Sequence, residues 1–478
     1  MTKQQKQVVF QQRQALPDPL VSERRMRSVM GNSARSFERM FTHYSYLALR
    51  SLKRSPGLTV LIVWTIGFGV AASMTTYSVF RAVSGDPIPW KSSKLFIPQI
   101  DIWGPQAAKQ NGGEPPEALS YADAMALMRA HRARLQSAIY RIAPSIVPTS
   151  LGRYPFKVGG NAVYAEFFSM LDVPFRYGGG WSTADDAQRA PMVVISSKLN
   201  QRLFEGGNSI GKTVNLEGSD YLVTGVLDDW NPQPRYYDVL DTGGFSIDQD
   251  DVFVPLGRAV DVGMRNKGET NCIKSPEEPG FLGLQHSSCV WIAFVVELDD
   301  AMAVAAYRQY LDSYARDQQR AGRFGWPPNS RLRDLRAWLD FEHVVPGDTR
   351  VSLLLAFGLL IVCLVNTTGL LLARFLRRSS EIGIRRALGA PRPAIFAQFL
   401  TEAGVVGLIG GTLGLLLTGF GVAGVSWVLP RSIAALARLD GSLVLTTLVV
   451  SIISTLLAGL YPTYRASLVQ PALQLKAN

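Results

Sequence analysis

One uninterrupted apolar stretch, residues 351–373, decides the fold: Val351-Ser-Leu-Leu-Leu-Ala-Phe-Gly-Leu-Leu-Ile-Val-Cys-Leu-Val-Asn-Thr-Thr-Gly-Leu-Leu-Leu-Ala373. It contains no aspartate, glutamate, lysine or arginine, and the windows 57–80, 403–430 and 441–464 share this property. About 20 apolar residues cross the hydrocarbon core of a bilayer. Buried core helices of a soluble protein are the alternative, but four such windows with basic residues beside them favour four transmembrane helices.

The distribution of charge excludes nucleic acid as a necessary partner. The chain has 478 residues, 47% of them apolar, and a formal net charge of +11. Residues 81–350 hold 28 basic and 32 acidic side chains, whereas the rest of the chain holds 21 basic and only 6 acidic ones. The positive excess therefore lies in the segments that flank the membrane, where cytoplasmic loops carry lysine and arginine. The apolar fraction also excludes a disordered protein.

Arginine counts predict the topology. The segment 374–402, between the second and third windows, holds six arginines: Arg374, Arg377, Arg378, Arg385, Arg386 and Arg392. The turn 431–440 holds only two, so the positive-inside rule places 374–402 and both termini in the cytoplasm. Residues 81–350 are then external, since long domains translocate largely regardless of charge.

The two ends of the chain are predicted to be cytoplasmic tails, residues 1–35 and 465–478. Residues 1–35 are polar, with glutamine-rich and basic stretches, and are expected to be disordered. Residues 36–56 combine basic side chains with apolar ones at helical spacing, which is typical of an amphipathic helix in the headgroup plane. A helix that packs on a soluble partner is the alternative.

The external segment is predicted to be an α+β domain. Two strand–helix–strand units are expected at about 90–157 and 290–345, the second with a strand at 331–341. A mostly β insertion, about 158–289, separates them. We expect the two units to pair in space as the halves of a split domain.

Residues 206–213, Gly-Gly-Asn-Ser-Ile-Gly-Lys-Thr, match the phosphate-binding pattern G-x-x-x-x-G-K-[ST]. That chemistry needs a strand before the loop and a helix after it. The flanking stretches instead predict a helix at 197–204, before the loop, and a hairpin at 213–227, after it. The glycines are therefore interpreted as turn residues.

We predict neither a catalytic nor a metal site. The four histidines are scattered, and no metal-ligand spacing or nucleophile motif is present. The carboxylates of Asp248, Asp250 and Asp251 could bind Ca²⁺, but an acidic loop is the better interpretation.

Helix packing is expected to rest on small residues in the third window. Gly407, Gly410, Gly411 and Gly414 form two overlapping G-x-x-x-G pairs, which let helices approach closely in lipid. The sequence leaves open whether they pack within the chain or in a dimer. Asn366 in the second window is predicted to form an interhelical hydrogen bond. No window holds a charged residue, which argues against an ion pathway.

A short cytoplasmic helix is predicted just after residue 379. Ser380 can cap it, Glu381 suits its positive end, and Gly389 with the prolines beyond stops it. Its apolar and basic side chains need either lipid headgroups or a protein partner. The candidate residues are Glu381, Ile382, Gly383, Ile384, Arg385, Arg386, Leu388 and Gly389.

Cys272 and Cys289 are the only cysteines of the external segment. An oxidising compartment permits a disulfide between them. Two free thiols are the alternative.

Several motifs together resemble the FtsX/MacB permease family, the membrane subunits of type VII ABC transporters. The resemblance lies in Glu381-Ile-Gly-Ile-Arg-Arg-Ala-Leu-Gly-Ala390 followed by a glycine-rich window, and in Gly459-Leu-Tyr-Pro-Thr-Tyr-Arg-Ala466. It extends to residues 47–57 and, in the insertion, to Pro191-Met-Val-Val-Ile195 and Val252-Phe-Val-Pro-Leu256.

This resemblance implies a fold and a function. The fold is a four-span α-helical membrane region with a large α+β periplasmic core, in a bacterial inner membrane. The chain is expected to be a non-catalytic permease that binds no cofactor. Because about 55 residues precede the first window and no ABC signature is present, ATP hydrolysis is expected from a separate cytoplasmic ABC ATPase.

The resemblance also implies partners and a mechanism. ATPase movement would push the 381–389 helix and change the periplasmic domain, for export or extrusion of substrate. The chain is expected to form a homodimer or to pair with a paralogous permease, with a periplasmic adaptor and an outer-membrane channel as further candidates. The alternative function is an FtsX-like regulator that activates a periplasmic cell-wall hydrolase. A membrane sensor without an ATPase is disfavoured by the cytoplasmic helix.

Overall fold

The computed structural model describes residues 50, 52, 55–110, 112–148, 154–246, 248–345, 347–428, 437 and 439–468. The predicted tail at 1–35 and nearly all of the predicted amphipathic helix lie outside the described residues, as does most of the tail at 465–478. The chain divides into two compact units. One holds residues 351–425 with both ends of the chain, and the other holds residues 79–350 with 426–437. We describe each unit by itself.

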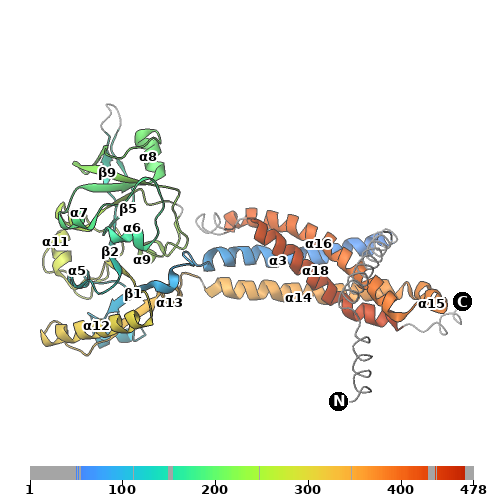
Figure 1. Cartoon of the computed structure of the whole chain (residues 1–478). Coiled ribbons are helices and arrows are strands. Elements are labelled where there is room, and N and C mark those ends of the chain that lie inside the picture. The colour runs from blue at the N-terminus through green and yellow to red at the C-terminus, as the bar shows by residue number, and fades with distance from the viewer. Residues whose placement is uncertain are drawn as a thin grey trace, which may run out of the picture. The chain divides into compact units, whose positions relative to one another are not determined.

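Four long helices form the first unit, which we call the helical unit (Figure 1). They are α3 (Pro56–Ser84), α14 (Gly347–Leu376), α16 (Arg392–Val428) and α18 (Gly441–Ser467), and a short helix, α15 (Ser379–Ala387), lies between α14 and α16 in sequence. In the described part of the chain these four helices are long and apolar enough to cross a membrane. The predicted four-span helical region is therefore confirmed.

Helix α16 begins earlier than the apolar window predicted. It starts at Arg392 and not near 403, so much of the segment 374–402 is helical. Pro391 and Pro393 flank its first residue, and proline is tolerated in the first turn because the backbone N–H groups there have no intrahelical acceptor. Charge marks where an apolar window ends, but a helix can continue beyond that point.

Two of the α16 glycines pack against α18. A Cβ atom built on Gly407 would lie 2.8 Å from Thr455 Oγ1, and one on Gly411 would lie 2.8 Å from Ser451 Oγ. Ser451 Oγ also donates a hydrogen bond to the carbonyl oxygen of Gly407, at 2.7 Å. This contact leaves no room for a side chain on α16.

The other two glycines pack against α3. Cβ atoms on Gly410 and Gly414 would lie 3.0 Å from Ile66 Cγ2 and 3.1 Å from Val70 Cγ1. Helix α16 is therefore held closely between α3 and α18, and the glycine pairs serve packing within the chain. This answers the choice that the sequence left open between intrachain and dimer contacts.

This packing predicts a position-specific effect of side-chain bulk. Gly411→Leu should destabilise the helical unit by about 1–3 kcal/mol, the usual cost of forcing extra atoms into a packed core. The measurement is the thermal unfolding of the detergent-solubilised protein. Gly424→Leu on the same helix is the control, since a Cβ there meets nothing within 4 Å. Equal melting temperatures for the two variants would contradict the packing scheme.

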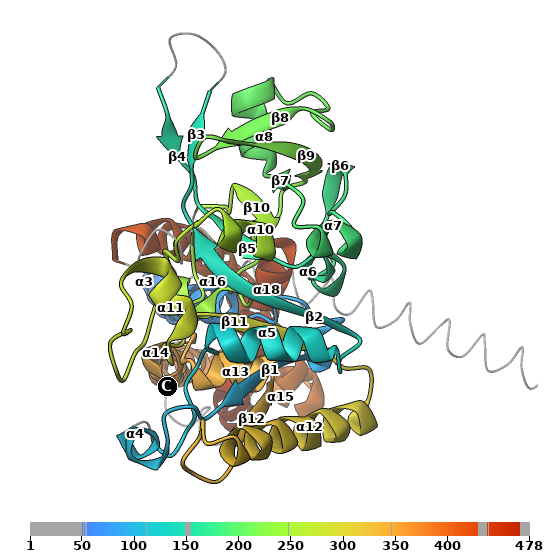
Figure 2. The ribbon, with the colours of Figure 1, turned by 90° about the vertical axis from the view of Figure 1, so that its left-hand side faces the viewer.

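The second unit, the core domain, is built on one 12-stranded sheet (Figure 2). The strands follow the order β12-β1-β11-β2-β5-β10-β7-β9-β8-β3-β4, and β6 pairs with β9. Their bounds are β1 Leu95–Ile100, β2 Leu135–Ile142, β3 Ser145–Val147, β4 Phe156–Lys157, β5 Gly160–Val163, β6 Phe175–Gly178, β7 Met192–Ile195, β8 Thr213–Leu216, β9 Ser219–Leu227, β10 Val252–Pro255, β11 Ala293–Glu297 and β12 Ser330–Asp334.

Helices cover this sheet. They are the 3-10 turn Ser92–Lys94, α4 Pro105–Gln110, α5 Tyr121–Ala130, α6 Glu166–Met170, α7 Thr183–Ala187, α8 Ser197–Phe204, α9 Val239–Thr242, α10 Leu256–Asp261, α11 Gly280–His286, α12 Ala301–Arg320 and α13 Leu335–Phe341. Side chains of α5 and α12 share one apolar core with Phe96 of β1, whereas side chains of α6 and α13 share a second core with Ile97. Every residue of β1 is buried as a result.

The two strand–helix–strand units interleave as predicted. Strand β1 lies between β12 and β11, and β11 pairs with β2, all antiparallel. This is a split pair of βαβ units. The insertion joins the same sheet through the antiparallel pair β2–β5. The described residues of 158–289 form six strands and six short helices. Of these helices, the sequence predicted α8, at 197–204.

The predicted strand at 331–341 is wrong in its second half. Strand β12 ends at Asp334, whose side chain accepts a hydrogen bond from the backbone N–H of Ala337 at 2.8 Å and so caps α13. Leu335, Trp338 and Leu339 are buried at helical spacing. Asp334, a residue type that caps helices, was the sequence signal for α13, but the alternating pattern around it favoured a strand.

Residues 248–251 lie in a loop, as predicted, and one of its carboxylates is buried. Asp250 is buried and accepts hydrogen bonds from Arg235 Nη1 at 3.1 Å and Asn161 Nδ2 at 2.8 Å. Burial in the same cluster raises the pKa of Asp238 well above its usual range. Asp250 is thus a structural ion-pair partner of Arg235, which lies 15 positions earlier in the chain.

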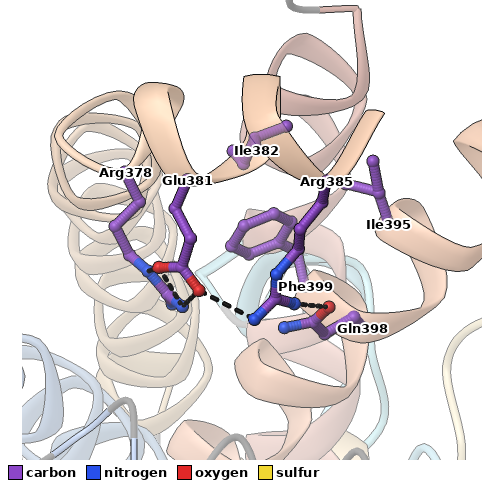
Figure 3. A pocket seen from close by; sticks show the side chains of 7 residues that line it. All are labelled: Arg378, Glu381, Ile382, Arg385, Ile395, Gln398 and Phe399. Atoms are coloured by element: carbon purple, nitrogen blue, oxygen red, sulfur yellow. Dashed lines mark hydrogen bonds and ion pairs between the residues drawn. The ribbon is translucent and has the colours of Figure 1, made fainter. Parts of the chain in front are cut away.

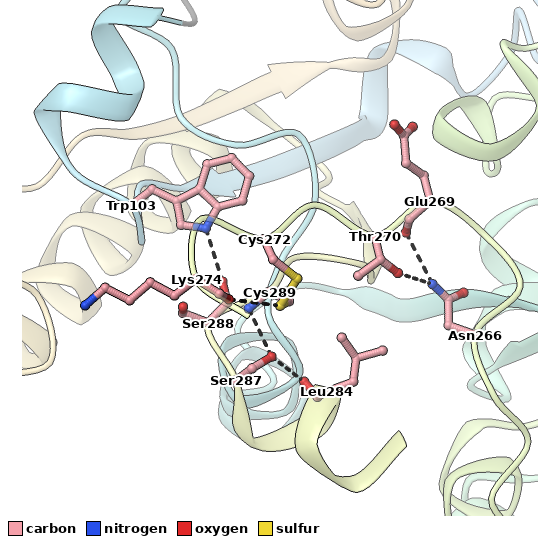
Figure 4. Close-up of a disulfide and its surroundings, with 10 residues drawn as sticks. All are labelled: Trp103, Asn266, Glu269, Thr270, Cys272, Lys274, Leu284, Ser287, Ser288 and Cys289. Carbon is pink, nitrogen blue, oxygen red and sulfur yellow. Dashed lines mark hydrogen bonds between the residues drawn. A yellow bond between two sulfur atoms is a disulfide. The ribbon is translucent and has the colours of Figure 1, made fainter. Parts of the chain in front are cut away.

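A disulfide joins Cys272 and Cys289 (Figure 4), with their Cα atoms 4.3 Å apart. The backbone of Asn271 pairs with that of Val290 just beside it. The bridge closes the loop that carries α11, and the Nε1 atom of Trp103 donates a hydrogen bond to the Ser288 carbonyl at the end of this loop, at 3.1 Å.

Candidate functional site

The candidate site is the short helix α15 and the side chains that hold it. Helix α15 begins at Ser379, with Arg378 at the N-cap position, so Ser380 lies in the first turn and is not the cap that we predicted. Glu381 lies in the first turn, and Arg385 lies in the last. That arrangement complements the helix dipole. Gly389 follows with a φ of +96°, a conformation that suits glycine and ends the segment.

The apolar side chains of α15 point in two directions. Ile382 is only 3% exposed and packs in the core of the helical unit with Ile395 and Phe399 (Figure 3). Ile384 and Leu388 are 57% and 83% exposed. Residues two apart on a helix of 3.6 residues per turn face nearly opposite ways. The three apolar side chains therefore do not act together as one contact surface: Ile382 anchors the helix, and Ile384 and Leu388 are presented outward.

A buried ion pair lies at the base of this helix. Arg374 Nη2 of α14 is 2.9 Å from Glu402 Oε1 of α16, and the side chains are 2% and 1% exposed. Arg378 Nη1 donates to the other carboxylate oxygen at 3.1 Å. Arg374 Nη1 also donates to Thr59 Oγ1 of α3, at 3.2 Å. One carboxylate and two guanidinium groups thus connect three helices.

The network continues through α15 itself. Glu381 accepts hydrogen bonds from Arg378 at 3.2 Å and from Arg385 at 2.8 Å, and Arg385 also donates to Gln398 Oε1 at 3.0 Å (Figure 3). Arg386 Nη1 donates to the carbonyl oxygen of Ser467 in α18, at 3.3 Å. Helix α15 is therefore bonded to α16 and α18, and Arg378 at its N-cap position bonds the α16 carboxylate that also pairs with Arg374 of α14.

The space between these side chains is too small for a ligand. The cavity lined by Arg378, Glu381, Ile382, Arg385, Ile395, Gln398 and Phe399 has a volume of about 10 Å³. That is about the space that one water molecule occupies. The site is a tightly packed junction of helices, and we call it the α15 joint.

The phosphate-like motif at 206–213 is not built to hold phosphate. Helix α8 precedes it and the β8–β9 hairpin follows, as predicted. The backbone N–H groups of Gly206, Gly211 and Lys212 donate to the carbonyls of Asn200, Val223 and Ser209. These donors cannot cradle phosphate oxygens. Nowhere in the described ranges do three or more histidine, cysteine, aspartate or glutamate side chains gather as metal ligands.

Sequence reasoning missed the central residues of the joint. Arg374 was counted only as a topology signal, and Glu402 was left at the boundary of the third window. Each lies directly beside an apolar window, after residue 373 and before residue 403. The sequence signal for an ion pair was available, because one apolar window ends beside an arginine and the next begins beside a glutamate. Asn366 lies on the exposed side of α14, so its interhelical bond stays a prediction.

Two family models match the chain. Residues 59–314 match the MacB-like periplasmic core domain, and residues 353–471 match the FtsX-like permease C-terminal domain. The first match covers more than half of the chain. The chain therefore belongs to the MacB/FtsX family of ABC transporter permeases, as the sequence motifs suggested.

Full-length relatives agree with this assignment. The chain is 25% identical over 449 residues to the uncharacterized ABC transporter permease YvrN of Bacillus subtilis, which covers 91% of this chain and 97% of that protein. It is 25% identical over 476 residues to the macrolide export ATP-binding/permease protein MacB of Syntrophobacter fumaroxidans, covering 91% of this chain. The chain spans 64% of that protein's length, and 44% of the length of MacB from Salmonella typhimurium.

Among solved structures, the periplasmic region of MacB from Actinobacillus actinomycetemcomitans matches at 13% identity with a TM-score of 0.33. The match covers 52% of this chain and 92% of that one. The extracellular domain of the transporter YknZ matches with a TM-score of 0.31 and 12% identity, covering 50% of this chain and 99% of that one.

The ion pair predicts an unequal response to charge removal. Glu402→Gln leaves two guanidinium groups beside a neutral amide in a buried site, and breaking a buried pair in this way costs about 3–5 kcal/mol. Asp317→Asn is the control, because the Arg320–Asp317 pair is largely exposed and such pairs contribute about 0–1 kcal/mol. Unfolding in detergent measures both. A change at Glu402 as small as that at Asp317 would disprove the structural role of the pair.

Proposed function

We propose that this chain is a permease subunit that transmits ATPase-driven movement across the inner membrane to the periplasmic core domain, for export or extrusion of a substrate. The observation that carries the proposal is the division of α15 into an anchored side and a free side. Ile382 and the ion pairs hold the helix to the helical unit, while Ile384 and Leu388 remain exposed. The helix is thus fixed to the helical unit on one side and presents a contact surface on the other.

A protein partner explains the exposed residues better than lipid headgroups do. A headgroup-bound helix would turn its arginines toward phosphates, but Arg385 bonds Glu381 and Gln398 and Arg386 bonds a backbone carbonyl. Two large apolar side chains outside the hydrocarbon region then need another apolar surface. The partner proposed is a separate cytoplasmic ABC ATPase, which would use ATP while this chain binds no cofactor.

The joint supports transmission of force from this contact. Movement of α15 would pull on Arg378 and Glu402 and so on the ends of α14 and α16. In sequence, α3 and α14 lead directly into and out of the periplasmic core domain. Ionic contacts that connect three helices would convert a push on α15 into a concerted shift of the spans.

The proposed assembly includes further partners. The chain would lie in the bacterial inner membrane with both termini and α15 in the cytoplasm. It would act as a homodimer or with a paralogous permease, and a periplasmic adaptor with an outer-membrane channel would complete an export machine. Pull-down from the periplasmic side tests the alternative: capture of a cell-wall hydrolase in place of an adaptor would favour an FtsX-like regulator.

Reporter fusions test the proposed orientation. A reporter that is active only outside the cytoplasm should work when it is fused after Gly243, in the core domain, and fail when it is fused after Ser379, in α15. A reporter that is active only in the cytoplasm should show the opposite pattern. The physical reason is the arginine asymmetry of the connecting segments. A reversed pattern would reject the whole topology.

The exposed side of α15 can be tested directly. Ile384→Asp with Leu388→Asp should abolish co-purification of the ATPase, because burial of each large apolar side chain contributes about 1.5–3 kcal/mol. Expression, membrane insertion and melting temperature should not change. Met302→Asp, at an equally exposed apolar position on α12, is the control.

Ile382→Asp separates the two sides of the helix. It should lower stability, because Ile382 is buried in the helical unit. If the Ile384/Leu388 double variant inserts normally and still binds and stimulates the ATPase, the coupling proposal is wrong.

A further inference from the structure

A cavity lies in the core domain where the chain enters it from α3 and leaves it into α14. Its volume is about 310 Å³, and pockets that bind small molecules have volumes of roughly 300–1,000 Å³. The lining comes from residues 83–87, from Pro234 and from side chains between Arg336 and Arg350. All of these residues belong to the core domain, and neither the α15 joint nor the proposed ATPase contact uses them.

The sequence places this cavity at the level of lipid headgroups. The first apolar window ends at Phe80, and the second begins at Val351. At 1.5 Å per residue, Ser84 lies about 6 Å beyond Phe80 along α3. Arg350 directly precedes Val351 on α14. The headgroup layer on each side of the hydrocarbon core is roughly 5–8 Å thick, so the cavity opens within or just above that layer.

An exposed tryptophan supports this placement. Trp90 follows the cavity wall by three residues in sequence and is 68% exposed. Its Nε1 atom donates a hydrogen bond to Asp172 Oδ2 at 2.9 Å, which leaves the apolar ring uncovered. Tryptophan rings of this kind are enriched at membrane–water interfaces, because one part of the ring is apolar and the other is polar.

Two arginine–aspartate pairs line the cavity. Arg336 Nη2 is 2.8 Å from Asp86 Oδ2, and Arg350 Nη2 is 2.8 Å from Asp340 Oδ1. The arginine side chains nevertheless stay 72% and 60% exposed. A guanidinium has five N–H donors, and among the described residues the aspartates accept from at most two of them. Each aspartate thus orients an arginine whose remaining donors can bind a phosphate group.

The chemistry of the lining favours a ligand that carries both signs of charge. The two pairs make the lining neutral overall, so a purely anionic ligand would meet carboxylates as well as guanidinium groups. A phosphodiester can accept from Arg336 and Arg350, while an ammonium group can donate to Asp340, which is 65% exposed. Leu339 and Val344 add an apolar wall, which suits the carbon chain beside the phosphate.

We infer that this cavity binds the headgroup of a zwitterionic aminophospholipid, of the phosphatidylethanolamine class, from the external leaflet. The inference rests on the proposed function for its orientation, in which the core domain is outside the cytoplasm. A lipid bound here contacts the segment that follows α3 and the first turn of α14. It therefore joins the two connections through which the core domain would be moved.

Lipid titration of the delipidated full chain, followed by native mass spectrometry, tests the site. Phosphatidylethanolamine should bind more tightly than phosphatidylglycerol at the same concentration. Arg336→Gln with Arg350→Gln should weaken this binding about 10-fold or more, since each hydrogen bond to a charged group contributes about that factor. Arg189→Gln with Arg320→Gln is the matched control, because these arginines are also exposed and paired with aspartates. Equal losses in the two double variants would overturn the inference.

Two single variants test the site without removing an arginine. Asp340→Asn gives the lining a net positive charge, so it should weaken phosphatidylethanolamine binding and strengthen phosphatidylglycerol binding. Ser84→Trp leaves the charge unchanged and should block both lipids, because Ser84 lines the cavity with an exposed side chain. An unchanged lipid preference in Asp340→Asn, or unchanged binding in Ser84→Trp, would reject the assignment.

Soluble glycerophosphoethanolamine distinguishes a membrane lipid from a free phosphodiester of the same chemistry. It should not displace bound phosphatidylethanolamine at equal concentration, and displacement would overturn the assignment to a lipid. Failure of the lipid site is also distinct from failure of the proposed function. If the reporter fusions and ATPase co-purification succeed and no selective lipid binding is found, the permease proposal stands and the lipid site is wrong.

Discussion

The helical unit depends on one buried carboxylate. Glu402 lies at the start of an apolar stretch, where an isolated charge would be strongly unfavourable. Arg374 supplies an opposite charge from the end of α14 and Arg378 supplies another from the N-cap position of α15, and Thr59 joins from α3. Because the cost of burial is offset only when this geometry is kept, the pair sets the register of α14 against α16. The position of α15 follows, since Arg378 bonds both Glu402 and Glu381.

Close packing of helix backbones also holds the helical unit together. Helices within lipid gain little from the hydrophobic effect when they associate, so van der Waals contact and interhelical hydrogen bonds have to hold them together. Glycines on two sides of α16 let α3 and α18 pack closely against its backbone. Ser451 adds a hydrogen bond to the α16 backbone. Among the residues that the structure describes, the outward side of α14 is largely exposed.

The proposed function depends on how force would move between a cytoplasmic partner and an external domain. Here the exposed pair Ile384 and Leu388 is connected to the spans by ionic bonds that are short and directional, whereas Ile382 prevents α15 from swinging free. A stiff joint transmits small displacements, because packed interfaces shift between discrete arrangements more readily than they deform continuously. The chain needs no catalytic centre for such a role, and the tightly filled space inside the joint agrees with a mechanical task.

Local composition determined a large part of this structure. Four charge-free windows predicted four helices, and the alternation and helical spacing of residues 81–350 predicted two interleaved βαβ units, because hydropathy and periodicity are properties of neighbouring residues. The tertiary structure decided which side of each element is buried. It turned Ile382 inward and Ile384 outward, enclosed Asp250 with Arg235, directed the α16 glycines to α3 and α18, and left Asn366 exposed. It also joined Arg374 to Glu402 across 28 positions. Burial and ion pairing depend on residues that are distant in sequence, and no local pattern records which of them will meet.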